Sequence, residues 1–288
     1  RPAWRAANYA SFDALLAPVV AGAGKNLGPL SGPAGLGAGA VLGAEVGALT
    51  GLLGRRVLGQ VDVRLLDPEA PLRLLLVVPN LHASAKALDV DAAQLVRWVT
   101  VHEVTHAVQF TGVPWLRPYL GELIGELLEL AQPKDKKHGG APRPAVPKLD
   151  VRALVEQARS GSLLTLVAGP ERAALLERIQ SIMSLIEGHA EHVMDAAGAP
   201  VLPDLDQLRA ALKARRETAT GFSPWKLLEK LLGMELKMKQ YAVGKAFCDE
   251  VVARSDVPTL HRAFAARELV PTAAELKDAG AWIARVSA

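Results

Sequence analysis

The chain has 288 residues, half of them hydrophobic and only 5% aromatic, and it carries a formal net charge of +3. This length and apolar content suffice for a large buried core, and they exclude a chain that is disordered as a whole. Alanine, leucine and valine supply most of the apolar residues, which favours helices over a β-sandwich. Basic and acidic residues interleave along most of the sequence, a pattern that argues against nucleic-acid binding.

The N-terminal part, about residues 1–59, is expected to be helical, with helices over 11–24 and 37–58 separated by a Gly/Pro-rich stretch. Residues 34–53 have the length of a membrane span and carry small residues, as packed membrane helices do. However, Glu45 lies near the centre of this segment, and the mean hydropathy there is modest. We therefore expect a buried helix whose small residues let another helix approach closely, and no membrane association.

Cys248 is the only cysteine, so the chain cannot form an intramolecular disulfide. This fits a reducing compartment and predicts a cytoplasmic location. The N-terminus shows no charged segment followed by a compact apolar run and a cleavage site, so we expect no signal peptide. Because the sequence starts at Arg1, a leader before that residue stays an open alternative.

The central part, about residues 60–131, combines strand and helix patterns. Short apolar runs bounded by turn residues predict strands, and longer segments with helical periodicity predict helices. The expected elements are strands at 60–66 and 71–78, a helix from Asp89 or Asp91 to Phe110, and a helix from Val113 or Pro114 to Leu130.

A segment over 132–148 interrupts this pattern with four prolines, two glycines and five basic residues, and should be a mobile surface loop. The C-terminal part, about residues 149–288, is again helical, with helices expected at 150–160, 170–196, 205–216 and 224–253. We detect no internal repeat. The sequence therefore predicts one domain over residues 1–288, mainly α with a small β-sheet.

The segment that carries chemistry is residues 102–106, His-Glu-Val-Thr-His. Residues four apart stack on one face of a helix, so His102 and His106 can bind one ion through nitrogens that hold zinc at about 2.0–2.1 Å. Glu103 lies about 100° around the helix, so its carboxylate reaches the metal-bound water rather than the metal and can accept its proton. An apolar stripe is expected to lie largely away from the metal face, formed by Trp98, Val101, Val104 or Thr105, and Val108.

A catalytic zinc needs a third protein ligand and an open fourth position. The metzincin pattern is excluded, because Gln109 and Gly112 stand where that class has Gly and His. The segment Glu-Gly-His-Ala-Glu-His at 187–192 instead supplies two carboxylates four residues apart on a second helix. Glu187 is the favoured ligand, and Glu191 is expected to accept a ring N–H from a liganding histidine.

Three other residues of this segment have different expected roles. Gly188 should let the second helix approach the metal helix closely. His189 lies about 200° from Glu187 around the helix, so it is expected to face elsewhere. His189 and His192 remain weaker alternatives as ligands.

Four strings together resemble the bacterial zincin-like metallopeptidases: VTVHEVTHAVQF, VPWLRPYL, MSLIEGHAEHVMD and GMELKMKQY. The resemblance runs from about Gly54 to Phe247. Members of that family are often labelled hydrolases, some by association with deazaflavin-cofactor biosynthesis. The resemblance implies a zincin-like fold and a gluzincin-like site with one zinc, which maps onto His102, Glu103, His106, Glu187 and, beside the ligands, Glu191.

The expected function is that of an enzyme, a zinc-dependent hydrolase and specifically a metallopeptidase that acts on a peptide or protein substrate. Tyr241 is a candidate donor to the developing oxyanion, and His261 is another. The rival hypothesis is a catalytically idle zincin-like scaffold that binds zinc and a protein or peptide partner. Glu103 argues against it, because a purely structural site does not require a carboxylate there. The sequence determines neither the substrate nor the oligomeric state.

Overall fold

The computed structural model describes residues 2–9, 54–55, 57–65, 67, 69–131, 163–198, 202, 207–211 and 234–288. Within its helices, the side chains of residues 131, 163–170, 197 and 234–241 are not described. The expected helices at 11–24 and 150–160, the segment 34–53 and the loop 132–148 lie outside these ranges. No helix in the described ranges is both long and apolar enough to cross a membrane.

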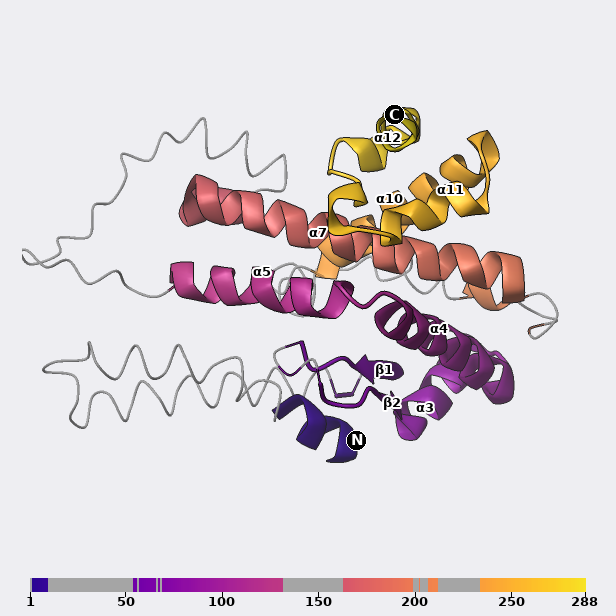
Figure 1. Cartoon of the computed structure of the whole chain (residues 1–288). Helices are drawn as coiled ribbons and strands as arrows, with labels where there is room; N and C mark the ends of the chain where they lie inside the picture. Colours follow the sequence, from indigo (N-terminus) through magenta and orange to yellow (C-terminus); the bar gives the residue numbers. More distant parts are fainter. Residues whose placement is uncertain are drawn as a thin grey trace, which may run out of the picture.

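The fold is mainly helical with one small sheet, which confirms the predicted class. The longest helix, α7, runs through the middle of the molecule, with α4 and α5 on one side and α10 to α12 on the other (Figure 1). The principal elements are β1 (Gly59–Asp62), β2 (Arg73–Leu76), α3 (Val78–Leu88), α4 (Ala92–Gly112), α5 (Leu116–Ala131), α7 (Leu163–Gly198), α10 (Met234–Arg254), α11 (Val257–His261) and α12 (Ala279–Ser287).

The sheet is an antiparallel pair in which Gly59 lies opposite Leu76 and Asp62 lies opposite Arg73. An ion pair joins the two strands where Asp62 lies opposite Arg73, and there Arg73 Nη2 donates to Asp62 Oδ2 at 2.7 Å. Both strands are shorter than predicted. After Asp62 the chain leaves the extended conformation, and Arg64 has a left-handed φ of 48°.

Helix α3 is an element that the sequence interpretation missed. The predicted strand at 71–78 ends directly before Pro79, and this proline lies in the first turn of α3, where proline needs no N–H and has a suitable φ. Asn80 is buried in the same turn, and its side-chain amide donates to the backbone oxygens of Gly54 and Val57. These bonds connect α3 to the chain that leads into β1.

Helix α4 starts as predicted from the second of the two alternative caps. The Asp91 side chain accepts a hydrogen bond from Gln94 N, which satisfies one of the first N–H groups of the helix. The expected apolar stripe is wrong in part, because Val104 and Val108 are 44% and 62% exposed. The buried face of α4 instead includes polar residues and consists of Leu95, Trp98, Val99, His102 and Gln109.

Helix α7 packs most closely on α10, and two glycines make this approach possible. A Cβ on Gly188 would lie 2.0 Å from the backbone carbon of Gly244, and a Cβ on Gly244 would lie 1.8 Å from the oxygen of Ser184. Neither contact leaves room for a side chain. Gly188 therefore does permit a close helix approach, but the partner is α10 and not the metal helix α4, which corrects the prediction.

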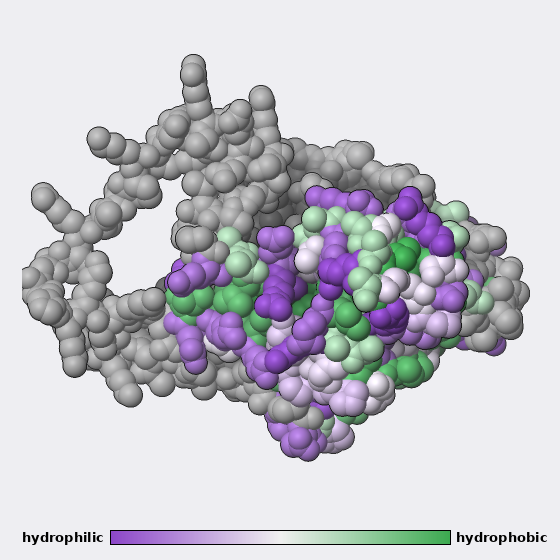
Figure 2. All heavy atoms as spheres, turned by 45° about the horizontal axis from the view of Figure 1, so that its top comes forward, coloured by the Kyte–Doolittle hydropathy of each residue, from purple (hydrophilic) through white to green (hydrophobic). Residues whose placement is uncertain are grey.

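The C-terminal helices pack against α7 and α10 around the fully buried Trp282, whose ring lies edge-on to Phe247 at 5.2 Å. The Trp282 indole N–H donates to Leu269 O at 2.8 Å, so this polar atom is satisfied inside the core. Figure 2 shows the side of the molecule that carries these helices, where hydrophilic residues separate the hydrophobic ones into small patches.

Candidate metal centre

Two helices bring three potential metal ligands together at the middle of the molecule. His102 and His106 project from one face of α4, and Glu187 reaches them from α7. His102 and Glu187 are only 8% and 5% exposed. The Trp98 ring stacks on the His102 ring, with centroids 5.7 Å apart and planes inclined by 8°. This stacking restricts the rotation of the imidazole.

The three donor atoms form a small triangle. His102 Nε2 and His106 Nε2 are 3.1 Å apart. Glu187 Oε2 lies 3.2 Å from His106 Nε2 and 3.7 Å from His102 Nε2. Within the described residues these are the histidine, cysteine and carboxylate groups that lie close enough together to hold one ion.

This triangle has the size that a zinc ion requires. A circle through the three atoms has a radius of about 1.9 Å, and zinc binds histidine nitrogens and carboxylate oxygens at about 2.0–2.2 Å. A single ion can therefore reach all three atoms at normal bond lengths. Two imidazoles and one carboxylate are also the ligand set of many catalytic zinc sites, which keep a fourth position open.

Glu103 is fixed next to these ligands by strand β1. Its Oε2 accepts a hydrogen bond from Val61 N at 3.0 Å, and no hydrogen bond to Oε1 is recorded within the described part of the chain. A Cβ on Gly59 would lie 2.6 Å from Val99 Cγ1 and 2.8 Å from Glu103 Cγ. Glycine at this position therefore lets β1 lie directly against the Glu103 side chain.

The surroundings of the Glu103 carboxylate shift its pKa upward overall. Burial raises the pKa of Glu103, although the neighbouring His102 and His106 act in the opposite direction. The Val61 N–H also lowers this pKa and Glu187 raises it, with a net upward shift. A carboxylate whose pKa moves towards neutrality accepts a proton more readily at pH 7, whereas a bound divalent cation would oppose the shift.

The His106 ring has polar partners on both of its nitrogens. Burial lowers the pKa of His106, but the hydrogen bond to Glu187 and the charge of that carboxylate outweigh it, so the net shift is upward. His106 Nδ1 lies 2.9 Å from Gln109 Oε1. Gln109 is 5% exposed and also contacts α7, a role that the sequence interpretation missed. Its spacing of three residues from His106 is the signal that could have identified it.

The remaining predicted residues lie around this group without joining it. Within the described residues the Glu191 side chain makes no hydrogen bond or ion pair, and its expected contact with a liganding histidine stays a prediction. His192 faces α10, where its Nδ1 lies 2.8 Å from Asp249 Oδ1. The side chain of Tyr241 lies outside the described part. His261 is exposed, with its ring 5.9 Å from that of His189.

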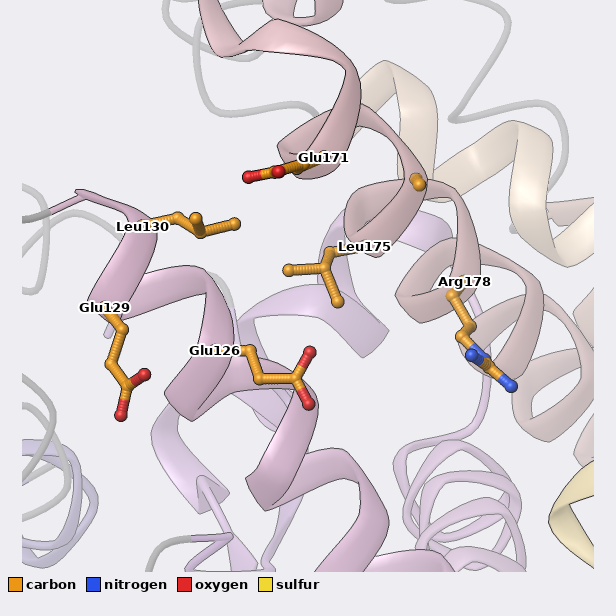
Figure 3. Close-up of a pocket in the computed structure, with 7 residues that line it drawn as sticks. Glu126, Glu129, Leu130, Glu171, Leu175 and Arg178 are labelled. Carbon is orange, nitrogen blue, oxygen red and sulfur yellow. The ribbon is translucent and has the colours of Figure 1, made fainter.

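A separate hollow of about 620 Å³ lies between α5 and α7. Figure 3 shows Leu130 and Leu175 pointing towards each other across it, while Glu129 and Arg178 point away. Its α7 residues precede Glu187 by 9 to 16 positions, which corresponds to about 14–24 Å along the helix. This hollow is therefore not part of the candidate metal centre.

The chain belongs to the zincin-like metallopeptidase family, whose model matches residues 1–283. The three residues that lie close together, two histidines on one helix and a glutamate on another, are of the kind that form such a site. No curated protein sequence matches the chain.

A solved structure is similar to almost the whole chain. The chain is 27% identical to a protein from Chloroflexus aurantiacus, described as a "putative hydrolase with a novel fold". The match covers 98% of this chain and 76% of that protein, with a TM-score of 0.66. The likeness extends over nearly the whole molecule and so includes both helices of the candidate metal centre.

Proposed function

We propose that the protein is a zinc-dependent hydrolase that cleaves a peptide or another amide bond. The observation that carries this proposal is the joint position of four side chains. His102, His106 and Glu187 present three donor atoms at the spacing of one zinc ion. Glu103 lies beside them, and a backbone N–H of β1 donates a hydrogen bond to one oxygen of its carboxylate.

Each side chain has a definite task in this proposal. The two imidazoles and the Glu187 carboxylate hold the ion, and zinc, when bound, supplies a Lewis acid that acidifies water and polarises a carbonyl. Glu103 takes a proton from the attacking water at Oε1, while the Val61 N–H keeps Oε2 in place. The same carboxylate then passes that proton to the leaving amine.

The substitution Glu103→Gln tests this mechanism. Glutamine has nearly the same size and can still pack against Gly59, but it cannot accept the proton. We expect about one zinc per chain to remain bound, while hydrolysis of a peptide library falls by about 10²–10⁴-fold. Glu129→Gln, on the exposed side of α5, should leave both quantities unchanged.

Two outcomes would contradict the proposal. If the parent protein binds no zinc, the ligand assignment is wrong. If Glu103→Gln hydrolyses substrate at the parent rate, another group is the base. A parent protein that binds zinc but cleaves no member of a broad peptide library would favour the idle scaffold.

A further inference from the structure

Gln109 connects the two helices of the metal centre through three hydrogen bonds. Its Oε1 lies 2.9 Å from His106 Nδ1. Its Nε2 lies 2.9 Å from the backbone oxygen of Ile186 and 3.0 Å from His189 Nδ1. Ile186 directly precedes Glu187, so one buried side chain on α4 contacts a proposed ligand on its own helix and the backbone next to a ligand on the other.

The chemistry of these partners determines which way the amide faces. A backbone carbonyl can only accept, so the Ile186 oxygen requires the NH2 group of Gln109. The Gln109 oxygen must then face His106, where it can only accept. His106 Nδ1 must therefore carry a hydrogen. In the neutral ring, the form that binds a metal, the lone pair is then on Nε2, the atom that faces Glu187 and His102.

The second hydrogen of the Gln109 amide points to His189. Because that amide nitrogen can only donate, His189 Nδ1 accepts, and the ring of His189 carries its hydrogen on Nε2. Phe264 packs edge-on against this ring at 4.8 Å, which holds the acceptor in place.

We propose that Gln109 is a positioning residue of the metal centre. The Ile186 carbonyl beside Glu187 orients the Gln109 amide, and the amide oxygen then fixes the tautomer and orientation of His106. The proposal deepens the proposed function and rests on it, because His106 and Glu187 are taken as zinc ligands. Residues that orient liganding histidines in this way typically contribute 10–100-fold to metal affinity or activity.

Two substitutions separate positioning from simple structural support. Gln109→Met keeps the size but removes all three hydrogen bonds. Gln109→Glu keeps an acceptor for His106, but it places a buried carboxylate against the Ile186 oxygen and loses the bond to His189. It should therefore destabilise the fold more than Gln109→Met does. We expect Gln109→Met to bind zinc about 10–100-fold more weakly than the parent, and Gln109→Glu to stay within about 10-fold.

The two variants should therefore rank in opposite orders by zinc affinity and by stability. Zinc affinity is measured by competition with a chelator, and stability by urea unfolding of the metal-free protein. Asn80→Leu is the control, because it removes two buried hydrogen bonds on α3 that involve no proposed ligand. It should lower stability and leave zinc affinity within about twofold of the parent.

Nitrogen-15 NMR of the imidazole rings provides a readout that does not depend on activity. In the parent, with and without zinc, His106 Nδ1 should carry a slowly exchanging hydrogen that Gln109→Met loses. The proposal is overturned if Nδ1 carries no hydrogen, or if the zinc affinities of both variants follow their stabilities. If the parent binds no zinc, the proposed function is refuted, and the metal-free spectrum still decides separately whether Gln109 fixes the tautomer of His106.

Discussion

At the scale of single residues, His102, His106 and Glu187 form a group that is largely shielded from water. Such burial is costly for a carboxylate and two imidazoles unless they share a proton or a cation. The two histidine Nε2 atoms and Glu187 Oε2 are close enough to share either a proton or a cation. Their separations also match those between the ligand atoms of one zinc ion. The ion would balance the charge of Glu187 and satisfy three buried atoms at once.

Glu187→Ala should abolish tight zinc binding, because two histidines alone make an incomplete site. His192→Ala, five residues further along α7, should leave the zinc affinity unchanged, since its ring pairs with Asp249 on α10. Glu191→Ala should cost at most about 10–100-fold if that residue contacts a liganding histidine, as expected from the sequence. Titration with a competing chelator measures all three. Retention of zinc by Glu187→Ala together with its loss in His192→Ala would show that the ligand set is different.

At the scale of secondary structure elements, glycines determine how closely two pairs of elements approach each other at and beside the site. Gly59 lets β1 lie against Glu103 on α4, and the pair Gly188 and Gly244 lets α7 lie against α10. Because Gly188 directly follows Glu187, the packing of α7 on α10 also sets where the proposed ligand stands. The position of the carboxylate thus depends on a helix that contributes no ligand.

Gly188→Ala should therefore weaken both the fold and the metal site. The added methyl group meets backbone atoms of α10 that cannot rotate away, so the helices must separate, at a cost of about 1–3 kcal/mol or more. Zinc affinity should fall as well, because Glu187 moves with the backbone. Gly125→Ala in α5 is the matched control, since nothing lies within 4 Å of the added carbon. That change should stabilise the protein by up to about 1 kcal/mol, the difference between glycine and alanine inside a helix. Equal stability of the two variants would refute the packing argument.

At the scale of the whole molecule, the proposed ion links segments that are far apart in the chain. Glu187 lies 81 positions after His106, and the chain between them includes α5. An ion that binds only the folded protein stabilises the arrangement of α4 and α7 by mass action.

Excess zinc should consequently raise the temperature of unfolding. At a free zinc concentration 100 times the dissociation constant, the folded state gains about 2.7 kcal/mol. For a chain of this size the gain corresponds to a shift of roughly 5–10 °C. Circular dichroism melts with zinc and with a chelator measure it, and Glu187→Ala should show no shift. An unchanged unfolding temperature of the parent protein would contradict the assignment of zinc to this group.

The features that the sequence determined by itself are local ones. The spacing of His102 and His106, the neighbouring Glu103 and the cap at Asp91 depend on the geometry of a single helix, which is the same wherever that helix packs. The mainly helical class follows from composition for a similar reason, because propensities act residue by residue. Glu187 was favoured because it is one of two carboxylates four residues apart on a second predicted helix, and the family resemblance indicated the same residue.

Contacts between distant segments were decided only by the tertiary structure. Helical periodicity assigned Val104 or Thr105, together with Val108, to an apolar stripe with Trp98. The face that packs on α7 is instead the one that carries His102 and Gln109. Gly188 was correctly interpreted as a position where another helix approaches closely. The residues next to it in the sequence did not indicate that the partner is Gly244 on α10. Gln109 acquires its role from a carbonyl 77 residues away. Burial and hydrogen bonding depend on which surfaces meet, and a helical pattern alone specifies a face without specifying what covers it.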